Sequence, residues 1–120
     1  MQYLALIYQG TTPVPTDEEA WATLSAEEQQ AVYADYKALN EHPGVTPGLP
    51  MGLPEHATTV RVEQGKTLTT DGPFVGMKEA VGGYFILEAD DLDAAIEVAA
   101  RIPAARLGGA IEVRPVETYW

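Results

Sequence analysis

Two short segments of this chain are apolar on both faces of the strands they predict, and this pattern limits the possible folds more than any other. They have the sequences YLALIY at residues 3–8 and YFIL at residues 84–87. A half-buried strand alternates apolar and polar residues, whereas a strand without alternation needs protein on both of its faces. We therefore expect both segments to be central strands of a sheet that is covered on each side.

Two other segments, 57–63 and 110–116, alternate apolar and charged residues and predict edge strands with one buried face. The alternating residues are Val60 and Val62 against Arg61 and Glu63, and Ile111 and Val113 against Glu112 and Arg114. A Gln64-Gly65 turn and a short strand at 66–70 add a hairpin extension to the first segment.

Three further segments combine helical periodicity with a capping residue at the start: 17–23, 26–40 and 90–102. The expected caps are Thr16 with Glu19, Ser25 with Glu28, and Asp90 or Asp91. The expected buried faces are Val32, Tyr36 and Leu39 in the second helix, and Leu92, Ala95, Ile96, Ala99 and Ile102 in the third.

The resulting order, β-α-β-β-α-β, predicts a single α+β domain over residues 1–120 with a ferredoxin-like plan and an antiparallel sheet. Helices on one sheet face leave the other face of the central strands without a cover. A second copy of the chain would supply it by packing sheet against sheet, as a homodimer that closes a dimeric α/β barrel. The alternative is that the Pro- and Gly-rich loop at 42–54 folds over this face.

Charge and composition argue against several classes of protein. The net charge is −11, with only seven Lys and Arg, so nucleic acid and anionic membrane surfaces are not expected partners. The chain has no cysteine, which excludes disulfides, thiolate nucleophiles and thiolate metal sites. The first residues, MQYLALIYQG, lack the basic region and cleavage site of a signal peptide, so we expect a cytoplasmic protein.

Asp71 lies in the most unusual part of the sequence, TTDGPFVGMKEAVGGYFILEA at residues 69–89. One interpretation is structural: the carboxylate forms an Asx turn, with Gly72 and Pro73 shaping the chain that leads into a central strand. The other is catalytic: a partly buried carboxylate at the rim of the barrel acts as a general acid or base. The sequence leaves both open.

Arg61 and Arg114 are candidate ligand-binding residues. Both are expected on opposite edge strands and on the face away from the helices. They could hold a small anionic ligand, because guanidinium groups bind carboxylates with two hydrogen bonds. The alternative is that they form ion pairs with Glu63, Glu112 or an acid of a second copy.

Lys78 and His42 complete the candidate ligand-binding set. Lys78 could attract an acidic ligand, or it could form an exposed ion pair with Glu79. His42 could line a site or interact with the C-terminal dipole of the preceding helix. The second histidine, His56, lacks metal-ligand spacing to it, so we expect neither a metal ion nor an organic cofactor.

Several blocks together resemble the DGPF-domain branch of the YCII-related family: ATTVR at 57–61, TDGPF at 70–74, GGYFILEA at 82–89, LDAAIEVAARIP at 92–103 and IEVRPV at 111–116. The resemblance covers nearly the whole chain and implies a ferredoxin-like fold in the dimeric α/β-barrel superfamily. It also implies a regulatory setting, because members of the branch are often encoded near genes for extracytoplasmic-function sigma factors.

The chain departs from the family pattern at two places. Gly76 and Met77 stand where relatives commonly carry an acid and a hydroxyl, and the first long helix has Tyr33, Asp35 and Tyr36 but no histidine. The His-Asp pairing suggested for other relatives therefore does not transfer. Two functions follow: a small-molecule-binding or regulatory accessory homodimer, or a cofactor-independent enzyme that uses Asp71.

Overall fold

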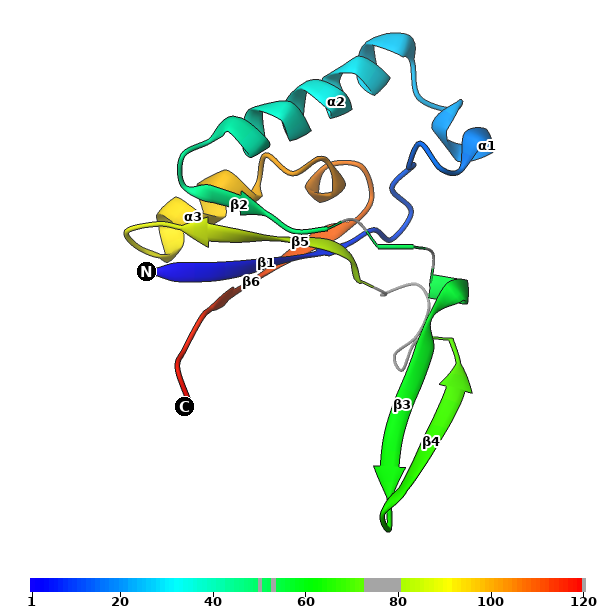
Figure 1. The fold of residues 1–120 in the computed structure, drawn as a ribbon. Helices are drawn as coiled ribbons and strands as arrows, with labels where there is room; N and C mark the ends of the chain where they lie inside the picture. The colour runs from blue at the N-terminus through cyan, green and yellow to red at the C-terminus, as the bar shows by residue number, and fades with distance from the viewer. Residues whose placement is uncertain (50, 53, 73–80, 120) are drawn as a thin grey trace.

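The two segments that are apolar on both faces form the central strands of an antiparallel sheet, as predicted. In the computed structural model, which describes residues 1–49, 51–52, 54–72 and 81–119, this sheet has four strands in the order β2-β5-β1-β6 (Figure 1). Their bounds are β1 Gln2–Tyr8, β2 Val45–Pro47, β5 Val81–Glu88 and β6 Ala110–Pro115. The fold is thus α+β, and the strand order is compatible with a ferredoxin-like plan.

The register of the central pair fixes which side chains share a face. Leu4 lies opposite Ile86, and Ala5 lies opposite Phe85. Side chains directly opposite each other point to the same side of a sheet, so Ala5 and Phe85 belong to the face that carries the core. That face also contributes the other buried strand residues, Tyr3, Ile7 and Leu87.

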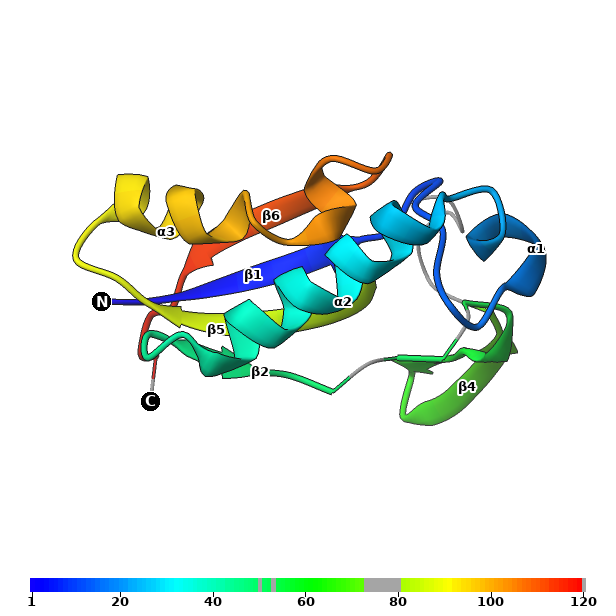
Figure 2. The same cartoon turned by 90° about the horizontal axis from the view of Figure 1, so that it is seen from above.

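Two helices, α2 (Ala26–Glu41) and α3 (Leu92–Ala99), lie on this one face of the sheet (Figure 2). The predicted caps start both helices: the Ser25 hydroxyl accepts a hydrogen bond from the Glu28 N–H at 3.1 Å, and the Asp91 carboxylate accepts one from the Ala94 N–H at 2.8 Å. Each side-chain oxygen satisfies a backbone donor that the helix itself leaves unpaired.

The short helix α1 (Glu18–Trp21) begins one residue later than predicted. The cap is Asp17, whose carboxylate accepts a hydrogen bond from the Ala20 N–H at 3.2 Å, and not Thr16. Both residue types make good caps. The sequence pattern therefore located the helix without deciding which of two neighbouring oxygens would reach the free N–H.

The predicted helix faces are confirmed for α2 and only in part for α3. Val32 and Leu39 of α2 are buried and Tyr36 packs against the core. In α3, Ala95 and Ala99 are buried, but Leu92 and Ile96 are each 49% exposed. The two alanines face the sheet and, being small, let the helix approach it closely, which turns the larger side chains outward.

The predicted edge strand at 57–63 is wrong in its partner. The edge beside β5 is β2, which lies within the 42–54 segment, and β3 (Thr58–Glu63) pairs only with β4 (Lys66–Asp71). Beyond β2 the chain stays attached to β5, because the Gly48 N–H donates to the Tyr84 carbonyl at 3.0 Å. The described part of this loop therefore extends the sheet edge and does not fold over the open face.

The β3–β4 hairpin projects away from the sheet on the side opposite the helices (Figure 1). Its turn has Gln64 at φ 51° and Gly65 at φ 75°, and two consecutive positive φ angles are typical of the tight turns that suit hairpin twist. Almost all of its side chains are exposed, including Val60 at 60% and Val62 at 66%.

The second face of the sheet carries the apolar residues Leu4, Leu6, Tyr84 and Ile86, which are partly buried by their neighbours. Within the described residues no helix lies over this face (Figures 1 and 2). The hairpin at one end and the C-terminal segment at the other extend beyond it (Figure 1). The open face therefore carries apolar side chains and lies between two segments that project beyond it.

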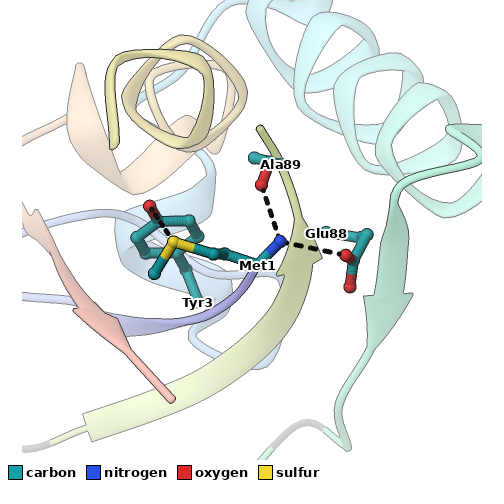
Figure 3. Close-up of polar contacts among 4 residues, drawn as sticks. All are labelled: Met1, Tyr3, Glu88 and Ala89. Atoms are coloured by element: carbon teal, nitrogen blue, oxygen red, sulfur yellow. Dashed lines mark hydrogen bonds and ion pairs between the residues drawn. The ribbon is translucent and has the colours of Figure 1, made fainter. Parts of the chain in front are cut away.

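The N-terminal residue is held against the end of β5 (Figure 3). The Met1 ammonium donates to the Glu88 carboxylate at 3.2 Å and to the Ala89 carbonyl at 3.1 Å. These contacts fix the start of β1 beside its central partner. In the part of the chain that the structure describes, none of the helices has the length and apolar character needed to cross a bilayer.

Candidate functional site

A cavity of about 330 Å³ lies between helix α2 and the sheet, where β1 ends and β5 begins. Its floor consists of Ile7, Gly83 and Phe85, all of which are buried. Pro47, the last residue of β2, also lines it, together with Gly48 and Leu49, which follow the strand. The volume is at the lower end of the range for small-molecule sites.

Aromatic rings form much of the apolar wall. Tyr36 of α2 stacks on Phe85 of β5 with ring centroids 6.3 Å apart and an angle of 21° between the planes. Tyr84 of the same strand also belongs to the lining, although its side chain points to the other face of the sheet, and Leu49, which is 77% exposed, stands at the mouth of the cavity. A ligand in the cavity would therefore contact the aromatic residues Tyr36 and Phe85 on the inside and the aliphatic side chain of Leu49 at the entrance.

Three residues with polar side chains also belong to the lining: Gln9 and Asn40, which carry amides, and Tyr36, which carries a hydroxyl. None of these side chains makes a hydrogen bond to another residue of the described chain. Tyr36 and Asn40 are four residues apart on α2, a spacing that places both on the same side of a helix. Gln9 approaches from the end of β1. These groups can therefore donate and accept hydrogen bonds to a bound molecule.

The Tyr36 hydroxyl remains a proton donor over the physiological range. Burial raises the pKa of Tyr36 above its ordinary value, because a phenolate would lose its hydration, and the nearby Arg106 guanidinium only partly opposes this effect. Arg106 itself is paired with Asp35, with 2.8 Å between Nη1 and Oδ2. The residues that line the cavity thus carry a neutral phenol and two neutral amides.

Gly83 keeps the floor of the cavity open. A Cβ atom built at this position would meet only the Cδ1 atom of Ile7, at 3.7 Å, which is an ordinary van der Waals distance. The backbone there is ordinary strand, so the fold does not require a glycine for its conformation. By contrast, a Cβ at Gly48 would come within 2.5 Å of the Tyr84 carbonyl oxygen. Gly48 is required by close packing, whereas Gly83 leaves space.

Asp71 lies at the end of β4 in the projecting hairpin and is exposed. The turn after it is fixed to the other strand: the Gly72 N–H donates to the Ala57 carbonyl at 2.7 Å, and the Thr59 hydroxyl donates to the Gly72 carbonyl at 2.6 Å. Asp71 is not among the residues that line the cavity. The rest of the DGPF turn, Pro73 and Phe74, lies outside the described residues, and the catalytic role of Asp71 stays a prediction.

Arg61 and Arg114 are not on opposite edges of one sheet, because Arg61 is in the hairpin and Arg114 is in β6. Each contacts an acid two residues away on its own strand: Arg61 Nη2 is 3.1 Å from a Glu63 oxygen, and Arg114 Nε is 3.0 Å from a Glu112 oxygen. The structure therefore does not bring the two guanidinium groups together as one fork. A role for either in ligand binding stays a prediction.

His42 is the C-terminal cap of α2, and its Nδ1 accepts a hydrogen bond from the Gly44 N–H at 3.1 Å. It does not line the cavity. Lys78, the remaining candidate, lies outside the described residues. Among the residues that are described, no three histidine or acidic side chains gather closely enough to share a metal ion.

Comparison with known proteins identifies the family. The sequence model of the YCII-related domain matches residues 1–119. The chain belongs to the YCII-related family. It is also 30% identical, over 124 aligned residues, to an uncharacterised protein of Rhizobium meliloti (strain 1021), and the match covers 99% of this chain and 94% of the relative. The YCII-related domain thus accounts for the whole described fold.

The sequence of this YCII-related chain did not indicate the residues that line the cavity as candidate catalytic or ligand-binding residues. The sequence pattern assigned Tyr36 to the buried face of its helix. The sequence contained one indication of the cavity. Tyr36 and Asn40 lie on the same face of α2, and the amide of Asn40 at the end of this apolar face indicates that the face reaches solvent there. The contribution of Gly48 depends on the pairing of β2 with β5, which the sequence pattern did not predict.

Proposed function

We propose that this YCII-related protein is a small-molecule-binding or regulatory accessory protein, and that the cavity beneath α2 is its binding site. The observation that carries the proposal is the open space above Gly83. Glycine in a strand weakens the strand relative to a residue with a side chain, and here a methyl group would fit without a clash. A site for a ligand gives a physical reason for leaving this space empty.

We also propose that the protein acts as a homodimer of the dimeric α/β-barrel type, with a ferredoxin-like protomer of the DGPF branch. The open sheet face supports this, because its apolar side chains lie between two projecting segments that could enclose a second copy (Figure 1). The Arg114–Glu112 pair on the β6 edge supports it as well. A two-fold interface needs a self-complementary surface, and neighbouring charges of opposite sign provide one.

The experiment is a thermal-shift screen of a pooled metabolite library against the wild type and two variants. In Gly83→Val the new side chain fills the cavity from a strand position that accepts β-branched residues. In the control, Gly52→Ala, a methyl group is added in an exposed loop, where the nearest atom is His56 Nδ1 at 4.0 Å. We expect a ligand to raise the Tm of the wild type and the control but not that of Gly83→Val.

The cofactor-independent enzyme remains the alternative, and Asp71→Asn separates it from the binding protein. Asparagine keeps the turn-forming side chain and removes the charge. If a ligand shifts Gly83→Val as strongly as the wild type and fails to shift Asp71→Asn, the site is at the DGPF turn and the cavity proposal is wrong. If no member of the library shifts the wild type, the binding function itself loses its support.

A further inference from the structure

We infer that the cavity selects an uncharged planar ring that carries adjacent hydrogen-bond donor and acceptor groups, such as an aromatic carboxamide or a lactam-type heterocycle. This inference rests on the proposed function, because it names the class of ligand for the same site. It differs from the small anionic ligand that Arg61, Lys78 and Arg114 suggested in the sequence. The two ligand classes can be distinguished by one pair of matched compounds.

The shape of the lining favours a flat molecule. Gly48, Gly82 and Gly83 contribute backbone to the lining, because glycine has no side chain, and the stacked rings of Tyr36 and Phe85 also border the cavity. Peptide planes and aromatic faces offer flat surfaces, on which a ring makes contact over its whole area. A ring also loses little conformational entropy when it binds, because it is already rigid.

The polar groups favour a neutral molecule. A primary amide presents a carbonyl acceptor and two N–H donors, so Gln9 and Asn40 are each best matched by a ligand group that both donates and accepts. A carboxylate ligand only accepts, and would leave the amide oxygens unmatched. The Tyr36 hydroxyl is available as a further donor to the ligand carbonyl.

The overall charge acts in the same direction. At a net charge of −11 the protein repels anions at long range. An anion entering the cavity would also lose hydration among apolar floor residues such as Ile7 and Phe85. A carboxamide has nearly the same shape as the carboxylate and avoids both costs.

The test is a titration of the ¹⁵N-labelled protein with benzamide, benzoate and cyclohexanecarboxamide, followed by the backbone amide signals. Benzamide and benzoate differ in charge at nearly constant shape, and cyclohexanecarboxamide keeps the amide but is not planar. The titrations are done at about 150 mM salt, so that long-range repulsion is largely screened. We expect benzamide to shift the Gly48 and Gly83 signals and to bind about tenfold more tightly than either other compound.

Two tyrosines on α2 provide a matched pair of variants. Tyr36→Phe removes the hydroxyl at the cavity and keeps the ring, and we expect it to weaken benzamide binding about threefold to tenfold. Tyr33→Phe removes a hydroxyl from a ring that is 56% exposed and packs edge-on against Trp21, outside the cavity. It should leave the benzamide affinity unchanged.

The outcomes separate the ligand class from the proposed function. If benzoate binds as tightly as benzamide and shifts the same signals, the inferred class is wrong and the cavity remains the binding site. If benzamide binding persists in Gly83→Val, the cavity is not the site and both proposals fail. If none of the three compounds shifts any signal, the inferred class is wrong, and the metabolite screen alone decides the proposed function.

Discussion

Strands β3 and β6 have nearly the same sequence pattern but differ in the burial of their apolar side chains. In β6, Ile111 and Val113 face the helix side of the sheet and pack against the core. In β3, Val60 and Val62 occupy the equivalent alternating positions and are 60% and 66% exposed. The alternation correctly indicates a strand in both cases. It does not indicate which surface, if any, covers the apolar face.

The difference follows from the partner strand. β6 pairs with the central strand β1, so its apolar side chains join a face that α3 already covers. β3 pairs with β4, whose side chains are all exposed, and no described element lies over the pair. A hairpin of two strands alone is only marginally stable in water. Within the described residues, the hairpin therefore has only its turn and the pairing of its two strands to stabilise it.

The largest difference between the two regions is expected for a pair of leucine substitutions. Leu87 of β5 is 1% exposed and Leu68 of the hairpin is 44% exposed. Leu87→Ala should lower the free energy of unfolding by about 2–5 kcal/mol, because it leaves a cavity in the core. Leu68→Ala should lower it by less than about 1 kcal/mol. Denaturant titration measures both, and equal losses would mean that the hairpin is covered in solution.

Hydrogen exchange tests the same contrast without a substitution. Amides of the β1–β5 pair should open only with global unfolding, whereas those of the β3–β4 pair should open locally. We expect protection factors in the hairpin to be at least about tenfold lower, which corresponds to about 1.4 kcal/mol. Repeating the measurement at higher protein concentration sharpens the result. Protection that rises with concentration in the hairpin alone would place the hairpin in the contact between copies.

A third comparison uses the two alternating strands directly. Val113→Ala should reduce the free energy of unfolding by about 1 kcal/mol, because Val113 is partly buried against the core. Val60→Ala should change it by no more than about 0.5 kcal/mol. Chemical denaturation of the two variants, with unchanged m-values as the control, tests this. A larger loss for Val60→Ala would contradict the view that its strand is uncovered.

The smallest effect concerns the pH dependence of the helix-covered region. Burial raises the pKa of Tyr36, so the folded state holds this proton more tightly than the unfolded chain does. The corresponding stability is complete below the unfolded pKa, near 10, and is lost as the pH rises through the higher folded value. The stability of the wild type relative to Tyr36→Phe should therefore fall above about pH 10. Chemical denaturation of the two proteins across this pH range measures the difference, and a difference that stays constant would contradict the expectation.

The cavity illustrates how far the sequence leads toward a site. The positions of Tyr36 and Asn40 on α2 are local properties and could be predicted from helical periodicity. The approach of Gly48 depends on which strand forms the edge beside β5, and the three-residue strand Val45–Pro47 is too short to give an alternating signal. The candidates chosen from charge, Asp71, Arg61, Arg114 and His42, all lie elsewhere than the cavity lining.

The sequence by itself determined the central strands, the positions of the helices and the face of α2 that packs on the sheet, because each depends on periodicity or on hydrogen bonds within a few residues. Only the tertiary structure decided that 45–47 and not 57–63 forms the edge beside β5, that the hairpin stands away from the sheet, and that space remains above Gly83. These features depend on contacts between segments far apart in the chain. Local patterns carry no information about which of several compatible surfaces will meet.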